Sequence, residues 1–287
     1  MSTNSKTAVV TGSTGGIGQE ICNLLAADGW DLVLVNRNRI KADAQVASLI
    51  AMRPDGVFKS HVADLLNPDE VTAAAHAIAA EHTAVSALYN VAGLLTDRPT
   101  QSPQGVEGHF VVNTLAPFLM TEGLRASLAG GATDGRPSVV VNFSSSAVNS
   151  VKKLDGERLT DPSNPGGLMG AYAQTKMALV VATAGMAEEL AADGVLAVCV
   201  DPGATKTPMT SGGDGMPWFV RLLVPLLFKS PEAQAKKVLK GVAAAVERNE
   251  PAAYVVEGRL KPMPALARDA AAQADLKSLL AGFTQPA

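Results

Sequence analysis

The feature that most limits how this chain can fold is a glycine-rich turn close to its N-terminus. Residues 6–11 favour a β-strand, residues 17–27 have the apolar spacing of a helix, and the turn between them has the sequence Thr11-Gly12-Ser13-Thr14-Gly15-Gly16-Ile17-Gly18. Glycines permit a tight turn and a close approach of the backbone to a ligand. Because a helix N-terminus offers unpaired N–H groups and a positive dipole end, this turn indicates a site for a phosphate group.

The glycines of this turn fit two spacings. Gly12, Gly16 and Gly18 match one arrangement, and Gly12, Gly15 and Gly18 match another, so the turn alone does not choose between them. The phosphate contacts are expected from the turn and from the first helical residues. These residues are Gly12, Ser13, Thr14, Gly16, Ile17 and Gly18.

Strand-like and helix-like segments alternate along the rest of the chain. Strands are expected at residues 31–35, 57–62, 85–90, 137–143 and 195–200, and helices at 41–51, 68–81, 105–128 and 170–192. Buried strands separated by such helices predict an α/β fold with a doubly wound parallel sheet of the Rossmann type, which binds NAD(P). No linker or repeat is evident, so we expect a single domain over residues 1–287, with a tail at 262–287 that forms a helix with a loose end.

Two stretches interrupt this alternation. Residues 148–170 are polar and are expected to form a long loop, and residues 205–230 form a lid-like segment whose second half is apolar. Both follow strands that end on the same edge of the sheet, so a substrate is expected to enter between them. The apolar part is equally compatible with a lid over an apolar substrate and with packing on the core or on another subunit, and contact with a membrane surface is a third reading.

The composition limits the classes of protein to which the chain can belong. Hydrophobic residues make up 47% and charged residues 18%, which allows a sizeable core. A net charge of −3 and an aromatic content of 4% argue against binding to nucleic acid. No signal peptide and no transmembrane segment is found, so we expect a cytoplasmic chain. Cys22 and Cys199 lie in apolar patterns typical of core residues, and the four histidines lack metal-ligand spacing, so no metal is expected.

The end of the second strand indicates which dinucleotide binds. A carboxylate at this place would hydrogen-bond the adenosine ribose hydroxyls and favour NAD(H), but Asn36 occupies it and Arg37 follows. A guanidinium can pair with a ribose 2′-phosphate. The sequence therefore favours NADP(H) over NAD(H), although Arg37 could also be an ordinary surface charge.

A second group of polar residues is expected at the carboxyl edge of the sheet. Tyr172 and Lys176 are four residues apart on a helix and share one face, where an ammonium lowers the pKa of a phenol. Such a pair can act as a general acid or base. The hydroxyls of residues 144–146 follow the strand at 137–143, and Asn113 lies inside an apolar helix where an unpaired amide would be costly.

Taken together, these motifs resemble the short-chain dehydrogenase/reductase family in its single-domain branch. The resemblance spans about residues 6–256. It is carried by the glycine-rich turn, Asp64, Asn90-Val91-Ala92-Gly93, Asn113, Ser145, Tyr172-x-x-x-Lys176 and Pro202-Gly203-x-x-x-Thr207. The resemblance implies an enzyme that transfers a hydride between NADP(H) and a carbonyl or alcohol substrate.

The resemblance also implies a role for each matched residue. Tyr172 would exchange the proton with the substrate oxygen, and Ser145, chosen by the pattern Asn-x-Ser-Ser, would hydrogen-bond that oxygen. Lys176 would hold the nicotinamide ribose and lower the pKa of Tyr172, and Asn113 would anchor a water in the proton relay. The remaining cofactor contacts would be Asp64 and Leu65 at the adenine, Asn90, Ala92 and Gly93 on the adenosine side, and Pro202, Gly203, Thr205 and Thr207 at the carboxamide.

The sequence departs from the family pattern in two places. Val91 replaces the usual second Asn of the Asn-Asn-Ala-Gly motif, and the interval from Ser145 to Tyr172 is long, as in members that resemble retinol dehydrogenases and protochlorophyllide reductases. Two other functions stay open: a non-catalytic NADP-binding sensor, and an epimerase or dehydratase of the extended branch, which Gly15 suggests. Many relatives pair through the helices that carry Asn113 and Tyr172, so a homodimer or a homotetramer is open too.

Overall fold

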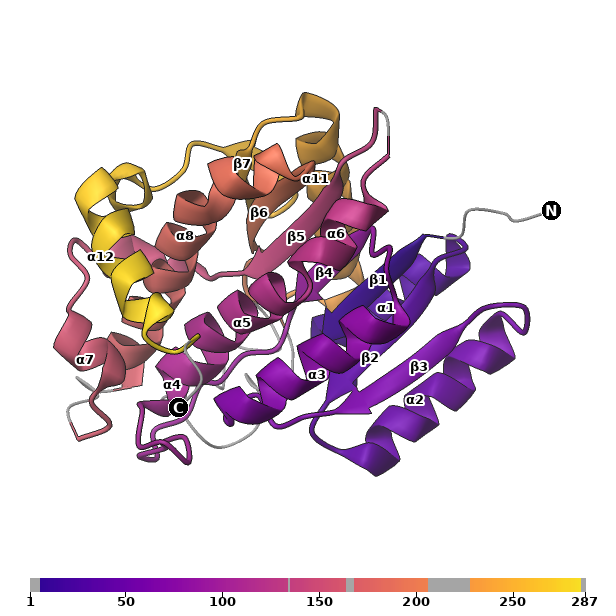
Figure 1. The fold of residues 1–287 in the computed structure, drawn as a ribbon, viewed down its shortest axis with the longest axis horizontal. Helices are drawn as coiled ribbons and strands as arrows, with labels where there is room; N and C mark the ends of the chain where they lie inside the picture. Colours follow the sequence, from indigo (N-terminus) through magenta and orange to yellow (C-terminus); the bar gives the residue numbers. More distant parts are fainter. Residues whose placement is uncertain (1–5, 134, 164–167, 206–227, 285–287) are drawn as a thin grey trace.

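In the part of the chain that the structure describes, eight strands form one sheet with helices on both faces (Figure 1). The computed structural model describes residues 6–133, 135–163, 168–205 and 228–284. The strands lie in the order β3-β2-β1-β4-β5-β6-β7-β8, and only β8 runs antiparallel to its neighbour. They are β1 (Thr7–Thr11), β2 (Asp31–Asn36), β3 (Phe58–Val62), β4 (Ala87–Asn90), β5 (Ser138–Phe143), β6 (Val195–Asp201), β7 (Ala252–Val256) and β8 (Arg259–Lys261). The predicted doubly wound α/β fold is confirmed.

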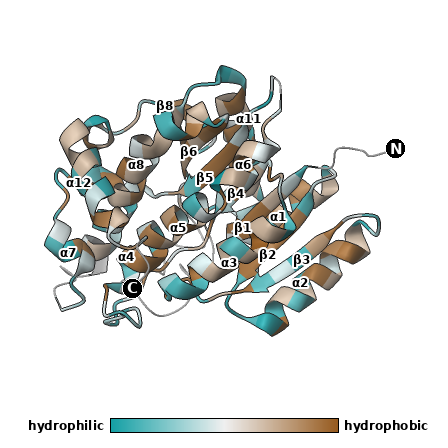
Figure 2. Cartoon of the chain, viewed as in Figure 1, coloured by the Kyte–Doolittle hydropathy of each residue, from teal (hydrophilic) through white to brown (hydrophobic). Residues whose placement is uncertain are grey.

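The helices pack on the two faces of the sheet because alternate strand residues point to opposite sides. Val9 and Leu88 lie in the core under α3, α5 and α8, whereas Val10 and Tyr89 lie in the core under α1, α2 and α11. Figure 2 shows apolar colouring on the central strands β1 and β2. The helices are α1 (Gly16–Ala27), α2 (Arg39–Met52), α3 (Pro68–Glu81), α4 (Gly108–Phe110), α5 (Ala116–Gly123), α6 (Arg125–Gly131), α7 (Gly156–Thr160), α8 (Leu168–Ala192), α11 (Pro231–Arg248) and α12 (Ala270–Ala281).

The helix expected at residues 105–128 is not one regular helix. It begins at Gly108 as α4, passes through a π-helical turn η1 (Val111–Leu115), continues as α5 and restarts as α6 at Arg125. Pro117 lacks an N–H and cannot donate to the carbonyl of Asn113 four residues earlier, so the α-helical bonding pattern has to change here. Turns of the π type inside helices are frequent at functional sites.

The loop expected at residues 148–170 is also partly helical. A 3₁₀ turn η2 (Ser146–Ser150) follows β5, and α7 forms where the side chain of Asp155 accepts a hydrogen bond from the Arg158 amide. Gln174 of α8 binds the segment between η2 and α7, since its side-chain amide donates to the carbonyl of Lys153 and accepts from the backbone amide of Asp155.

The sheet extends beyond the last expected strand. After α11, β7 pairs with β6, and β8 returns through a turn at Glu257 and Gly258, which both have positive φ values as a type I′ hairpin turn requires. A 3₁₀ turn η3 (Ala265–Arg268) leads to α12, so the expected helix in the tail is confirmed. In Figure 1 this yellow helix lies along α8.

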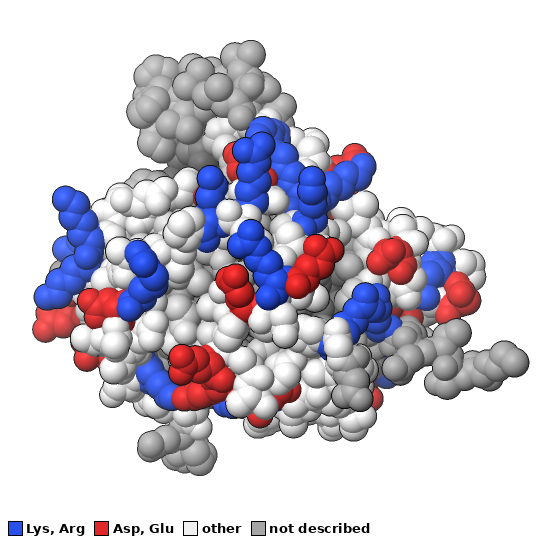
Figure 3. Space-filling view, turned by 90° about the horizontal axis from the view of Figure 1, so that it is seen from above, with Lys and Arg blue, Asp and Glu red and all other residues white. Residues whose placement is uncertain are grey.

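One face of the molecule carries side chains of both charges. Figure 3 shows basic and acidic side chains interspersed on the face seen from above. None of the described helices combines the length and the apolar character that a membrane crossing requires. No group of three His, Cys, Asp or Glu among the described residues could hold a metal ion.

Because α12 packs against the core, its buried leucines should contribute to stability. Leu280 is 1% exposed, so Leu280→Ala should lower the free energy of unfolding by about 2–5 kcal/mol. Ile40→Ala is the control, because Ile40 is 81% exposed and its loss should change the value by less than about 0.5 kcal/mol. Urea titration measures both. Equal, small effects of the two substitutions would show that α12 is not part of the folded body.

Candidate active site

The glycine-rich turn brings the backbone of β1 against the start of the loop after β4. Gly12 has a φ of 66°, and a Cβ built on it would lie 2.8 Å from the Cα of Ala92. A Cβ on Gly18 would lie 2.3 Å from the carbonyl oxygen of Gly12. Gly16 has a φ of 56°, whereas Gly15 is extended at −177°, a conformation open to any residue. The backbone therefore requires glycine at positions 12, 16 and 18, which decides between the two spacings.

Behind this turn lies a buried chain of polar side chains. The hydroxyl of Ser13 donates to Oε1 of Gln45 and accepts from Nδ2 of Asn36, both at 2.8 Å, and Nε2 of Gln45 donates to the Ser13 carbonyl. Ser13, expected as a phosphate contact, thus directs its hydroxyl inward. Gln45 was missed, although it lies between Ala42 and Leu49 on the buried side of α2.

The end of β2 leaves two groups for a ligand. Asn36 is 5% exposed, and its Oδ1 is buried without a hydrogen-bond partner. One N–H of Nδ2 is donated to Ser13, so Oδ1 is the atom of this amide that is left without any partner. The side chain of Arg37 is exposed next to it.

The residues expected at the adenosine side differ in their surroundings. Oδ1 of Asp64 accepts from the amide of Leu66, and Asp64 and Leu65 are both half-buried after β3. Asn90 is only 2% exposed, and its Nδ2 donates to Oδ1 of Asn142 at 2.9 Å inside the sheet. Its side chain is therefore held on the face of the sheet that α5 and α8 cover. Ala92 and Gly93 are half-buried beyond Asn90 at the edge of the sheet.

The loop after β6 is fixed at its first residues. The amide of Gly203 donates to Oδ1 of Asp201, and the Thr205 hydroxyl donates to the Gly203 carbonyl, both at 2.9 Å. Pro202 accepts a hydrogen bond from Gln234 of α11. Thr207 and residues 206–227 of the expected lid lie outside the described residues.

The three residues expected at the reacting oxygen lie together. Ser145 caps η2 after β5, and its hydroxyl lies near enough to the half-buried Tyr172 to lower the pKa of the phenol. Ser144 instead points inward, to the Lys176 carbonyl at 3.5 Å, and Ser146 is exposed. The Lys176 ammonium is 5.9 Å from the centre of the Tyr172 ring.

The electrostatics of this pair differ from the expectation. Burial raises the pKa of Tyr172, the hydrogen bond from Ser145 lowers it only in part, and the charge of Asp201 raises it further. Lys176 is 4% exposed, donates to the Phe143 carbonyl at 2.7 Å, and has its pKa lowered to about 8 by burial. Loss of water therefore outweighs any stabilisation of the Tyr172 phenolate by Lys176 in the chain alone.

Asn113 connects this group to the loop after β4. It is fully buried in η1, its Oδ1 accepts from the Leu94 amide at 2.7 Å, and its Nδ2 donates to the Leu94 carbonyl and to the Thr175 hydroxyl. Thr175 in turn donates to the carbonyl of Tyr172. Both N–H donors of the Asn113 side chain are thus bonded to the protein. A relay water at this place would therefore have to donate its hydrogen bond to an acceptor oxygen.

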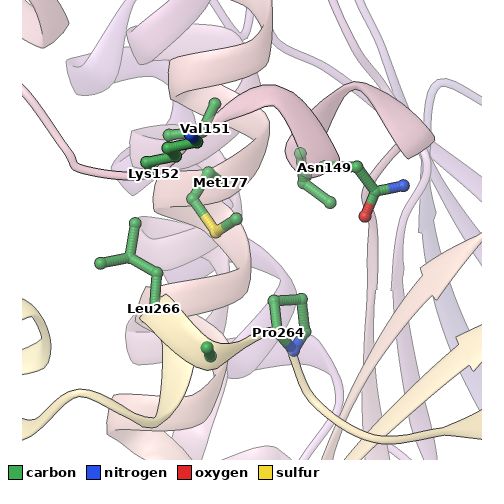
Figure 4. A pocket seen from close by; sticks show the side chains of 8 residues that line it. Asn149, Val151, Lys152, Met177, Pro264 and Leu266 are labelled. Carbon is green, nitrogen blue, oxygen red and sulfur yellow. The ribbon is translucent and has the colours of Figure 1, made fainter.

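A cavity of about 400 Å³ lies between α8, the η2 turn and η3. Figure 4 shows Met177 of α8 and Leu266 of η3 pointing into it, with Asn149 on the η2 turn. It is not lined by Ser145, Tyr172 or Lys176, so it is separate from the group at the carboxyl edge.

Comparisons with known proteins agree with this geometry. The short chain dehydrogenase family model matches residues 6–156 and 160–214. Human retinol dehydrogenase 13 is 29% identical over 236 residues, and human polyprenol dehydrogenase is 30% identical over 238 residues. Each alignment covers 80% of this chain and 70% of the relative.

Solved structures show the same fold. A short-chain dehydrogenase from Sphingobium yanoikuyae in complex with NADPH has a TM-score of 0.67 at 24% identity, with 98% of both chains covered. The 3-ketoacyl-(acyl-carrier-protein) reductase from Brucella melitensis, complexed with NADH, has a TM-score of 0.64 at 23% identity and covers 88% of this chain and 97% of that one. The chain belongs to the short-chain dehydrogenase/reductase family of oxidoreductases, in a subgroup that resembles the retinol dehydrogenases.

Proposed function

We propose that the chain transfers a hydride between NADP(H) and a carbonyl or alcohol, with Tyr172 exchanging the proton. The observation that carries this proposal is the grouping of three side chains: the buried Lys176 ammonium lies 5.9 Å from the centre of the Tyr172 ring, and Ser145 lies near the same tyrosine. Two hydroxyls that meet at the carboxyl edge of a parallel sheet can both hydrogen-bond one substrate oxygen.

The residues at the sheet edge fit a dinucleotide. The close approach of Gly12 to Ala92 leaves no room for a side chain, and the N-terminus of α1 follows as an anion site. The buried, unpartnered Oδ1 of Asn36 suits a ribose hydroxyl, and the exposed guanidinium of Arg37 suits a 2′-phosphate. The two similar structures hold NADPH in one case and NADH in the other, so the preference for NADP(H) rests on Arg37.

Burial raises the pKa of Tyr172, so its hydroxyl is protonated at neutral pH. In the reductive reaction it can donate this proton to a carbonyl oxygen while Ser145 donates a hydrogen bond to the same oxygen. When bound, the reduced nicotinamide supplies the hydride. The Lys176 ammonium donates one N–H to the Phe143 carbonyl, which leaves two N–H donors for the ribose hydroxyls.

The substrate is proposed to be apolar. Retinol and polyprenol, which the names of two relatives give as substrates, are both long apolar alcohols. The second half of the segment at residues 205–230 is also apolar in sequence. A clear preference for small charged ketones in a panel of carbonyl compounds would refute this part of the proposal.

Tyr172→Phe tests the proton route. The substitution keeps the ring but removes the hydroxyl, so kcat should fall by roughly 10²–10⁴-fold. The affinity for NADPH, measured by fluorescence titration, should change little. Tyr254→Phe is the control, because Tyr254 lies in β7, which holds none of the expected catalytic residues. Unchanged turnover in Tyr172→Phe would exclude Tyr172 as the proton donor.

Arg37→Asp tests the choice of cofactor. Loss of a charge-assisted bond to the 2′-phosphate should lower the ratio of kcat/KM for NADPH over NADH by roughly 10- to 100-fold. Arg39→Asp makes the same charge change two residues away, where the guanidinium faces Asp43. If both variants shifted the ratio equally, the preference would be a general field effect and not a contact of Arg37.

Lys176→Met tests the cost of burying the ammonium. The folded-state pKa of Lys176 is about 8, below the ordinary 10.5, so between these values the unfolded chain binds a proton that the folded chain does not. Stability of the wild type should therefore rise with pH across this window. The gain in unfolding free energy from Lys176→Met should be largest at pH 7 and should shrink above pH 8. The exposed Lys41→Met is the control, and a gain independent of pH would contradict the burial cost.

A further inference from the structure

Two ionisable side chains are buried at the start of the helix that carries Asn113. Glu107 and His109 are each 3% exposed, and His109 Nδ1 lies 2.7 Å from Glu107 Oε1. Burial of such a pair rarely adds stability over apolar side chains of the same volume. A role beyond stability is therefore worth seeking in what the pair holds.

The hydrogen bonds of this pair determine the tautomer of His109. The Thr96 amide is a donor and lies 3.2 Å from Nε2, so Nε2 must be the acceptor. The ring proton is then on Nδ1, where it is donated to Glu107. The other carboxylate oxygen of Glu107 accepts from the Phe110 amide at 2.8 Å, so both oxygens are used.

Beyond Thr96, the loop after β4 runs back along the helix. The Gly108 amide donates to the Thr100 carbonyl at 2.8 Å, and Gln101 forms a β-bridge with Glu107. A Cβ on Gly108 would lie 2.8 Å from the Thr100 carbonyl oxygen, so the contact is close. Together with the bonds of Asn113 to Leu94, these contacts attach the loop at both ends, and His109 provides the attachment between them.

The same loop lies where a substrate would bind. It begins directly after Ala92 and Gly93 at the carboxyl edge of the sheet, and ligands of such sheets bind at this edge. Glu107 also donates its amide to the Thr160 carbonyl at the end of α7, so the pair connects the loop after β4 with the segment that follows Ser145.

We propose that Glu107 and His109 are positioning residues: the carboxylate fixes the tautomer of His109, which holds the loop at residues 94–101 as a wall of the substrate site. The proposal rests on the proposed reductase function for its kinetic consequence, and on hydrogen bonding alone for its structural one.

Glu107→Gln separates the tautomer from the packing. Glutamine has the same shape, but it offers one acceptor oxygen where Glu107 uses two. If that oxygen caps Phe110, the amide donors face Nδ1 of His109 and draw the ring proton to Nε2. Two donors, Nε2–H and the Thr96 amide, would then face each other. His109→Gln is the conservative variant, since its amide can still donate to Glu107 and accept from Thr96, whereas His109→Leu removes both bonds.

Two measurements test the proposal. Hydrogen exchange followed by mass spectrometry should show peptides covering residues 94–101 exchanging roughly tenfold faster in Glu107→Gln and His109→Leu, and near the wild-type rate in His109→Gln. With NADPH and a carbonyl substrate, Glu107→Gln should raise the KM for the carbonyl roughly three- to tenfold, with kcat and the KM for NADPH nearly unchanged. Glu122→Gln on α5 is the matched control and should leave exchange and kinetics unchanged.

The outcomes are distinct. A purely structural role would lower the folded fraction without moving the KM for the carbonyl, and that result would overturn the proposal. Unchanged exchange at residues 94–101 would overturn it as well. If Glu107→Gln failed to fold, the two His109 variants would decide in its place. If the wild type oxidised no NADPH, the proposed function would fail, and the exchange rates alone would decide whether the pair holds the loop.

Discussion

The parallel pairing of β4, β5 and β6 is the constraint on which the candidate site depends. Asn90, Asn142 and Cys199 are partners across these strands, so the chain leaves the sheet at nearly the same level in each. Because β5 ends at Phe143, the carbonyl of this residue is free to accept a hydrogen bond from the Lys176 ammonium. Ser145 follows two residues later and lies near Tyr172. Register in the sheet thus places groups that are far apart in the sequence within one site.

Burial of polar groups around this edge makes the site rigid and sets its chemistry. Asn142 accepts from Asn90 and donates to Thr183, so the amides inside the sheet are bonded to each other. The same loss of water lowers the pKa of Lys176 and raises that of Tyr172, and the second shift keeps the phenol protonated. A protonated phenol at this place is suited to donate its proton to a carbonyl.

The fold and the centre of the site could be predicted because they follow from local patterns: alternating strands and helices, and a Tyr and a Lys four residues apart. The π-helical turn at Asn113 could not be predicted, although Pro117, four residues later, lacks the N–H that would bond to the Asn113 carbonyl. The Glu107–His109 pair was missed because its partner, the Thr96 amide, is a backbone group that no side-chain motif reveals. The inward side chains of Ser13 and Asn90 depend on contacts across the sheet, which the sequence does not show.

The most direct test of the account is the full chain mixed with NADPH and apolar aldehydes or ketones. Absorbance of NADPH and the alcohol product are measured together. The account predicts that NADPH is consumed in a one-to-one ratio with the alcohol formed. Binding of NADPH without consumption across the panel would indicate a sensor, and a changed substrate without net loss of NADPH would indicate an epimerase. Either result would contradict the account.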